Sequence, residues 1–189
     1  MSRDDATLLV VDVQEKLLRA MREPQRLTWN IARLLDGARL LGVAATATEQ
    51  YPQGLGPTVA SLAERLGQQA AAVHEKLAFS CWGCEALRKQ LEQLDRPNVL
   101  ICGMETHVCV QQTTLDLLAA GYRVFVAVDA VASRSTLDHD VALRRMEAHG
   151  ATLTTVEAAL FEWCATAGTP EFKAISQLVK QTLPTETHS

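Results

Sequence analysis

The chain has 189 residues, of which 48% are hydrophobic and 21% are charged, and its formal net charge is −4. This length and composition predict one globular domain and exclude a disordered chain. The acidic balance, without any block of basic residues, argues against a nucleic acid or an anionic membrane surface as a partner. No run reaches the roughly 20 apolar residues that a membrane span needs, and no export signal is visible, so we expect a cytoplasmic protein.

Six short apolar runs have the length and composition of β-strands. Several are apolar on both faces, as parallel strands covered by helices are. These runs span residues 8–13, 42–48, 71–74, 99–102, 123–128 and 152–156.

Stretches with helical spacing separate the runs. They span residues 27–41, 59–66, 85–94, 108–120, 141–149 and 170–183, and glycine follows several of them, as is typical of helix C-termini. Alternating strands and helices predict a parallel sheet with helices on both faces. We place a single domain at residues 5–182 and a frayed tail at residues 183–189.

The carboxyl ends of the strands are where an open parallel sheet binds its ligands. The polar residues that follow the predicted strands are therefore the candidates for chemistry. They are Asp12 and Gln14, Glu49 and Gln50, Glu75 and Lys76, Glu105 to Cys109, and Asp129 and Ser133.

Asp12 and Lys76 each admit two interpretations. A carboxylate after a buried strand is costly without a partner, so Asp12 is either a general base or a helix cap. Lys76 either reaches water at the end of its strand or points inward, where it pairs with Asp12 and favours a thiolate.

Cys109 lies where a strand passes into a helix. The positive end of the helix dipole there is expected to lower the pKa of its thiol, and free backbone N–H groups can bind an oxyanion. The alternative interpretation is a small buried hydrophobic residue.

Several segments together resemble the isochorismatase-like hydrolases over about residues 5–182. The most specific is the nucleophile loop, Gly103-Met104-Glu105-Thr106-His107-Val108-Cys109-Val110. The others are Val11-Asp12-Val13-Gln14, Glu75-Lys76 with Phe79-Ser80, Asp129 to Arg134 and Ala151 to Glu157; Thr48 to Gly56 and Phe172 to Ile175 are similar to the branch named isochorismatase domain-containing proteins.

The resemblance implies a Rossmann-like three-layer α/β/α fold with a six-stranded parallel sheet, and a homo-oligomer. It implies a triad of Asp12, Lys76 and Cys109 acting on a small-molecule substrate, by amide hydrolysis through a thioester. It also implies a cis peptide between Met104 and Glu105, which would direct the Glu105 and Cys109 N–H groups to one oxyanion.

The chain differs from two branches of that family. Nicotinamidases carry an Asp-x-His metal pair after the second strand, whereas Thr48 to Pro52 contains no histidine. We therefore expect no metal and no other cofactor. True isochorismatases lack the cysteine, so Cys109 favours amide chemistry. The pocket is expected to be lined by Gln14, Glu49, Tyr51, Phe79 and Trp82, for most of which loop packing is the alternative.

Three other functions stay open. Cys81-Trp82-Gly83-Cys84 is a C-x-x-C sequence and fits a thiol–disulfide redox protein. A structural zinc site could use Cys81, Cys84, Cys102 and His107, although a second paired-ligand knuckle is missing. The third is a non-catalytic interaction module. His139 is interpreted as a packing or surface residue.

Overall fold

One parallel β-sheet forms the centre of the molecule. Within residues 1–183, which the computed structural model describes, the sheet has six strands in the order β3-β2-β1-β4-β5-β6, and each neighbouring pair is parallel. This confirms the predicted sheet, and it is the Rossmann strand order. The strands are β1 (Ala6–Val11), β2 (Ala44–Gln50), β3 (Ala72–Lys76), β4 (Asn98–Met104), β5 (Arg123–Ala132) and β6 (Thr152–Thr154).

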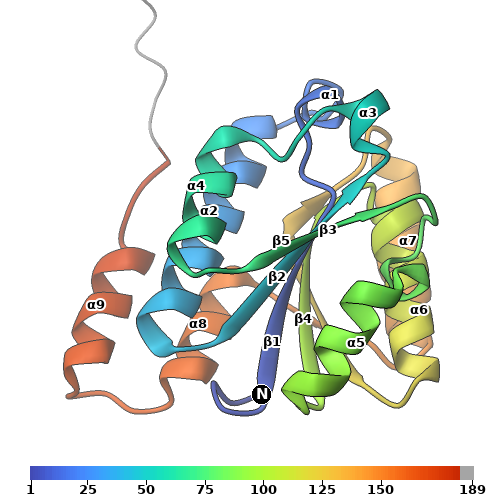
Figure 1. The fold of residues 1–189 in the computed structure, drawn as a ribbon. Coiled ribbons are helices and arrows are strands. Elements are labelled where there is room, and N and C mark those ends of the chain that lie inside the picture. Colours follow the sequence, from blue (N-terminus) through green and yellow to red (C-terminus); the bar gives the residue numbers. More distant parts are fainter. Residues whose placement is uncertain (184–189) are drawn as a thin grey trace, which may run out of the picture.

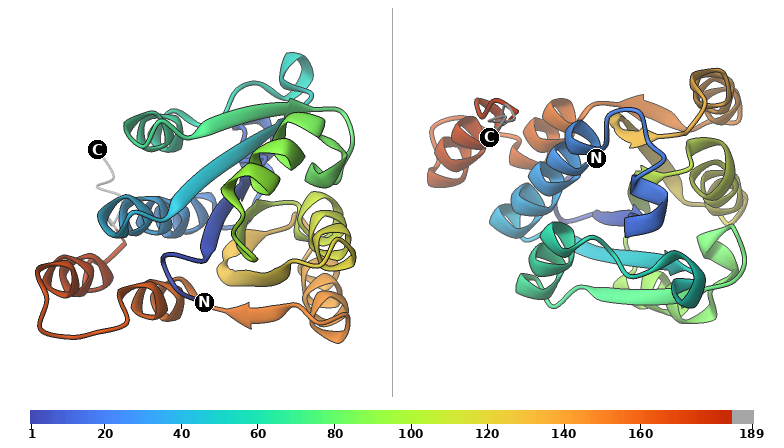
Figure 2. Two further views of the ribbon diagram at one scale, coloured as in Figure 1. Left: turned by 60° about the horizontal axis from the view of Figure 1, so that its bottom comes forward. Right: turned by 90° about the horizontal axis from the view of Figure 1, so that it is seen from above.

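Helices cover both faces of the sheet and complete the predicted three layers (Figure 1). One layer consists of α2 (Pro24–Leu41), α4 (Ala60–Gln68), α8 (Val156–Cys164) and α9 (Pro170–Val179). The opposite layer consists of α5 (Glu85–Leu94), α6 (Gln111–Ala119) and α7 (Thr136–Ala148), as the two views of Figure 2 also show. None of the helices within residues 1–183 has the length and apolar character needed to cross a membrane.

Strand β1 supplies both hydrophobic cores. Because successive side chains of a strand point to opposite faces, Leu8 and Val10 pack in the core under α2, while Leu9 and Val11 pack in the core under α5 and α6. All four side chains are buried. The strand is thereby fixed on both sides, and the residue that follows it, Asp12, has a defined position.

The carboxyl ends of the strands lie at one end of the molecule, beneath α1 (Glu15–Leu18) and α3 (Pro52–Leu55) (Figure 1). The chain order reverses between β1 and β4, so this is the topological switch point where such sheets bind ligands. Residues that end β1, β2, β3 and β4 therefore meet there.

Gly103 allows β4 to approach β1 closely at this end. Its φ is +134°, and a Cβ at this position would overlap the backbone carbonyl oxygen of Val11. Only glycine fits both the conformation and the space. The contact brings the chain that follows β4 next to Asp12.

Helix α8 has no counterpart among the predicted helices. The apolar run that predicts a strand over residues 152–156 ends instead at Thr154, and Thr155 caps the helix by accepting a hydrogen bond from the Ala158 N–H (3.3 Å). Most side chains in α8 are apolar, so its sequence shows little contrast between a polar and an apolar face.

Several predicted boundaries were also wrong. Strands β2 and β3 run on to Gln50 and Lys76, so Glu49, Gln50, Glu75 and Lys76 lie within their strands and not after them. Strand β5 runs on to Ala132 through an irregularity in its pairing with β4, so Asp129 lies within the strand and not after it. Helix α7 begins at Thr136 and not at residue 141, because Ser135 accepts a hydrogen bond from the Asp138 N–H (3.3 Å) and caps it. Helix α9 ends at Val179, before residue 183. The predicted frayed tail lies outside the described residues, apart from Leu183.

Candidate active site

Asp12 is completely buried at the end of β1, in the left-handed region with φ +53°. Its N–H donates to the carbonyl of Thr48 (3.1 Å), the residue opposite Val11 on β2. The two carboxylate oxygens have different donors: Oδ1 accepts from the Thr48 hydroxyl (2.8 Å) and Oδ2 from Lys76 Nζ (2.7 Å). These two donors hold the carboxylate in one orientation.

The ammonium of Lys76 is enclosed by oxygen atoms. It donates to Asp12 Oδ2 (2.7 Å), Gln50 Oε1 (2.8 Å) and the carbonyls of Phe79 (3.0 Å) and Ala78 (3.3 Å). An ammonium has three N–H bonds, and these partners use them all. Burial, the largest single effect, opposes the charged form, but Asp12 and the neighbouring thiols Cys81 and Cys109 together outweigh it and raise the pKa of Lys76. Lys76 is thus a buried, permanently charged partner of Asp12.

Cys109 lies in a π-helical turn, η2 (Thr106–Val110), between β4 and α6. Such turns are rare and are often found at functional sites. Glu105 starts the turn in the left-handed region (φ +56°), and its carbonyl accepts from the Val108 N–H (2.8 Å). The buried thiol of Cys109 hydrogen-bonds to the side chain of Asp12 and interacts electrostatically with Lys76. The structure therefore brings Asp12, Lys76 and Cys109 together.

The prediction of a lowered thiol pKa is not borne out. Burial raises the pKa of Cys109, and the Asp12 carboxylate raises it further, while Lys76 opposes them only in part. Burial disfavours the charged form of a thiol in this position, and a negative neighbour disfavours a second negative charge. In the resting site Cys109 is a neutral thiol beside a carboxylate.

The predicted cis peptide between Met104 and Glu105 is also wrong. Among the described residues the structure has no cis peptide bond. The left-handed backbone conformation of Glu105 makes the turn instead.

Two residues of β2 complete the site: Thr48 was not predicted as part of it, and Gln50 was a candidate only by its position at the strand end. Thr48 donates to Asp12, and Gln50 accepts from Lys76 while its amide donates to the carbonyl of Leu77 (2.8 Å). Both are buried. The parallel pairing of β2 with β1 and β3 places them there, and one signal was available: polar side chains continue to the end of an otherwise apolar strand.

The predicted pocket residue Gln14 is engaged with the backbone. Its amide donates to the carbonyls of Gln50 (3.0 Å) and Gly56 (2.6 Å), and its oxygen accepts from the Gln50 N–H (2.8 Å). Glu49 similarly accepts from the N–H (2.6 Å) and the hydroxyl (2.7 Å) of Thr58. These side chains attach the segment containing α3 to the strand ends.

The predicted aromatic pocket residues have different surroundings. Tyr51, after β2, is 51% exposed, and Phe79, in the loop after β3, is 54% exposed. Leu77, the first residue after β3, is 76% exposed. Trp82 packs edge-on against Tyr122, with ring centroids 5.7 Å apart. The first two are free to meet a ligand, whereas Trp82 has a packing partner.

Three side-chain contacts hold the nucleophile loop from the side of β5 and α7. Arg134 Nε donates to Glu105 Oε1 (3.0 Å). His107 Nδ1 lies 3.0 Å from Ser133 Oγ. The fully buried Thr106 hydroxyl lies 3.0 Å from His139 Nδ1, so His139 supports the loop.

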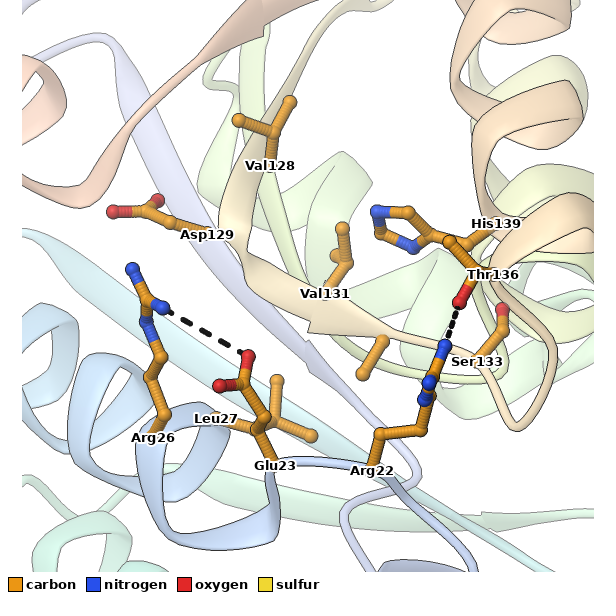
Figure 3. A pocket seen from close by; sticks show the side chains of 11 residues that line it. Arg22, Glu23, Arg26, Leu27, Val128, Asp129, Val131, Ser133, Thr136 and His139 are labelled. Carbon is orange, nitrogen blue, oxygen red and sulfur yellow. Dashed lines mark hydrogen bonds and ion pairs between the residues drawn. The ribbon is translucent and has the colours of Figure 1, made fainter.

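A cavity of about 300 Å³ opens beside these supports (Figure 3). Its polar wall includes Ser133 and His139, and Arg22 crosses its edge to contact the Thr136 hydroxyl. The triad residues do not line it. The full lining is Arg22, Glu23, Arg26, Leu27, Val128, Asp129, Val131, Ala132, Ser133, Thr136 and His139.

The redox and zinc interpretations find little support in the geometry. All five cysteines are free thiols. Burial raises the pKa of Cys81 to about 11, the opposite of the lowered pKa that a redox nucleophile needs. Over residues 1–183 no three His, Cys, Asp or Glu side chains are grouped as metal ligands, so Cys81, Cys84, Cys102 and His107 do not form a site.

Comparison with known proteins gives consistent matches. The family model described as "Isochorismatase domain" matches residues 6–158. The isochorismatase domain-containing protein 2 of Bos taurus is 43% identical, covering 94% of this chain and 84% of its own. A solved structure described as the MAR1 ribonuclease of Caenorhabditis elegans superposes with a TM-score of 0.91, at 36% identity, over 100% of this chain and 96% of that one. YcaC from Pseudomonas aeruginosa, solved with covalent acrylamide, has a TM-score of 0.87 at 29% identity, over 94% and 90% of the two chains.

Proposed function

Because this chain belongs to the isochorismatase domain family, whose members include isochorismatase-like hydrolases, we propose that it is a cysteine hydrolase that cleaves the amide bond of a small molecule. The observation that carries the proposal is the hydrogen bond from the Cys109 thiol to the Asp12 carboxylate, which Lys76 and Thr48 hold in place. A nucleophile, a base and a third group that orients the base are the parts that nucleophilic catalysis requires.

In the first step the thiol loses its proton as it attacks. Asp12 accepts the proton while Cys109 Sγ forms a bond to the amide carbonyl carbon, whose oxygen becomes an oxyanion. The neutral resting thiol fits this order, since the proton leaves only when the carbonyl takes up the charge. The Glu105 and Cys109 N–H groups are the proposed oxyanion donors, and one such donor contributes roughly 3–4 kcal/mol in comparable sites.

The second step separates the products. The C–N bond breaks, and Asp12 returns its proton to the leaving amine, so that a thioester remains on Cys109. Asp12 then takes a proton from water, whose oxygen attacks the thioester; the C–S bond breaks, and the proton returns to the thiolate. The acid is released and the thiol is regenerated.

The role of Lys76 follows from its contacts. Since its three N–H bonds are used by Asp12, Gln50 and carbonyls of the loop after β3, it does not donate directly to the sulfur in this arrangement. Instead it fixes Asp12 and adds a positive charge near the developing thiolate, with which it interacts through space. We therefore propose that the main role of Lys76 is to position the base Asp12, and that its effect on Cys109 is secondary.

The exposed side chains of Tyr51 and Phe79, at the same edge as the triad, are proposed to contact the substrate. The relative described as a ribonuclease raises RNA as another substrate. The net charge of −4 disfavours it, because nucleic-acid binding needs positive charge along the phosphates. The substrates we propose are small amides. We also propose that the chain forms a homo-oligomer.

The test is a screen of small primary and secondary amides, with RNA as a further arm. Reactions with amides that are hydrolysed are quenched within milliseconds, and the mass of the intact protein is measured by mass spectrometry. We expect an adduct of the acyl mass on Cys109, and no turnover in Cys109→Ala, which should fold normally. Full activity of Cys109→Ala, or RNA cleavage independent of Cys109, would overturn the proposal.

A further inference from the structure

A second thiol, Cys81, lies on the far side of Thr48 from the general base. It is completely buried in the short helical turn η1 (Cys81–Gly83), just after the loop that follows β3 and Lys76. Its Sγ is 3.4 Å from the Thr48 hydroxyl oxygen. That hydroxyl is the group that donates to Asp12 (2.8 Å), so the two contacts form a continuous chain.

The direction of the hydrogen bonds in this chain is fixed by chemistry. Asp12, paired with Lys76, is a carboxylate and can only accept, so the single hydroxyl proton of Thr48 points to Asp12. Thr48 can then only accept from its other neighbour. Cys81 must therefore be the donor, and it must be a neutral thiol.

The surroundings of Cys81 favour that neutral state. The charged or titratable groups that interact with it are Asp12, Lys76 and Cys109. Burial, followed by the Asp12 carboxylate, raises the pKa of Cys81 to about 11, against the opposing effect of Lys76. The thiol keeps its proton throughout the range in which the enzyme would work.

The backbone of Cys81 is hydrogen-bonded to helix α6. Its N–H donates to the hydroxyl of Thr113 (2.8 Å), a fully buried residue of α6. Helix α6 follows directly on the turn that carries Cys109. Cys81 thus links the loop after β3, the proposed base Asp12 and helix α6.

We propose that Cys81 is a positioning residue for the general base, donating its S–H to Thr48 so that the Thr48 hydroxyl is held and polarised toward Asp12. A hydroxyl that accepts one hydrogen bond donates a stronger one. The relay therefore strengthens the hydrogen bond from Thr48 to Asp12 and restricts the rotation of the carboxylate. The inference rests on the proposed function, since it assigns Asp12 as the base.

Alkylation of Cys109 measures this effect without a known substrate. Iodoacetamide is added at limiting concentration at pH 7, and the rate at Cys109 is followed by peptide mass. In Cys81→Ala we expect this rate to fall by about two- to threefold, because the carboxylate that accepts the thiol proton is held less firmly.

A graded series separates positioning from loss of packing. Thr48→Val removes the direct donor and should lower the alkylation rate by more than Cys81→Ala, whereas Cys81→Ser keeps a donor and should restore the wild-type rate. Cys84→Ala is the matched control, because that buried thiol of the same segment contacts the Glu75 carbonyl (3.6 Å) and not Thr48. The rate at Cys109 should not change in this variant.

The outcomes distinguish the two claims. If Cys109 is alkylated at the same rate in wild type, Cys81→Ala and Thr48→Val, the relay is wrong and the hydrolase proposal stands. If Cys81→Ala and Cys81→Ser lower the rate alike, Cys81 acts by packing and the relay is again wrong. If Cys109 does not react in the wild type, both claims fail.

Discussion

The triad and the cavity of Figure 3 both lie at the carboxyl ends of the strands, yet they differ in almost every physical property. Around the triad, Asp12, Lys76 and Cys109 are 0%, 5% and 4% exposed, and the polar atoms of Asp12 and Lys76 are occupied by protein partners. The cavity is a hollow of about 300 Å³ whose charged side chains reach solvent. The comparison shows two kinds of polar region, and the chemistry is proposed for the one whose polar groups are buried and hydrogen-bonded, not for the open cavity.

The two regions are nevertheless connected. Thr106 and His107 of the nucleophile loop contact His139 and Ser133 of the cavity wall. The cavity side therefore supports the nucleophile from behind. Changes in the triad should abolish chemistry, while changes in the cavity wall should only weaken it.

The largest expected effect contrasts the carboxylates of the two regions. Asp12→Asn removes the base and leaves Lys76 charged and buried without its partner. We expect turnover to fall by at least about 10³-fold, which combines lost base catalysis with loss of orientation. The free energy of unfolding should drop by about 3–5 kcal/mol in urea titrations.

Asp129→Asn is the matched control from the cavity wall. Its Oδ1 accepts from the Val156 N–H (2.8 Å), and an asparagine oxygen can do the same. Activity within a few-fold of wild type is expected. An equal loss of turnover in Asp12→Asn and Asp129→Asn would contradict the different roles assigned to the two regions.

The next effect concerns the close contact that brings β4 to β1. Gly103→Ala places a Cβ against the Val11 carbonyl in a left-handed backbone, so we expect a loss of more than about 3 kcal/mol of stability together with loss of activity. Gly121→Ala shares the positive φ (+92°) but has nothing within 4 Å of the added carbon. It should cost only about 1 kcal/mol. Similar melting temperatures for the two variants would contradict this.

Removal of the support for the nucleophile loop should have a moderate effect. His139→Ala leaves the buried Thr106 hydroxyl without its partner, which costs about 1–3 kcal/mol. We expect a several-fold lower turnover and a lower melting temperature. His149→Ala, at the other end of α7 and exposed, is the comparison, and it should change neither quantity. An inactive His139→Ala that melts like wild type would assign His139 to the chemistry.

The smallest effect is a pH dependence that the buried thiols impose. The folded-state pKa of Cys81 is raised to about 11, and that of the core thiol Cys102 is raised further by burial. Unfolded thiols lose their protons near pH 8.5. Above that pH the unfolded state holds fewer protons, so stability falls as pH rises, by up to about 1.4 kcal/mol per pH unit for each thiol.

Cys102→Ala tests this sign in the core, away from the triad. Urea unfolding of wild type and variant at pH 8, 9 and 10 should give a shallower decline for the variant, by about one proton. A steeper decline, or stability that increases with pH in the wild type, would show that the thiol is not held neutral by burial.

The fold and the triad could be predicted from the sequence for specific reasons. Strands such as 8–13 and 99–102 are apolar on both faces, and Leu8 to Val11 are indeed buried on both faces of β1. Asp12 follows β1, Lys76 ends β3 and Cys109 lies in the turn after β4, so the strand order brings all three to the same end of the sheet. Position along the chain made them candidates, and the resemblance implied the triad.

The partners of the triad could not be predicted in the same way. Whether Thr48 faces Asp12 depends on the register between β1 and β2, and a shift of one residue would reverse it. The pKa of Cys109 depends on how completely water is excluded, which no local pattern encodes. The left-handed turn at Glu105 is likewise set by how the loop closes on β5 and α7.

The measurement that tests the central claim most directly is competitive labelling of the five cysteines. Limiting iodoacetamide is applied to wild type and Lys76→Met from pH 5 to pH 9, and peptide masses identify the modified residue. We predict that Cys109 reacts ahead of the other buried thiols, Cys81 and Cys102, in the wild type. Its advantage should disappear in Lys76→Met, which removes both the positive charge that lowers the pKa of Cys109 and the group that holds Asp12. Preferential reaction of Cys81 or Cys84, with Cys109 inert, would contradict the account and favour the redox interpretation.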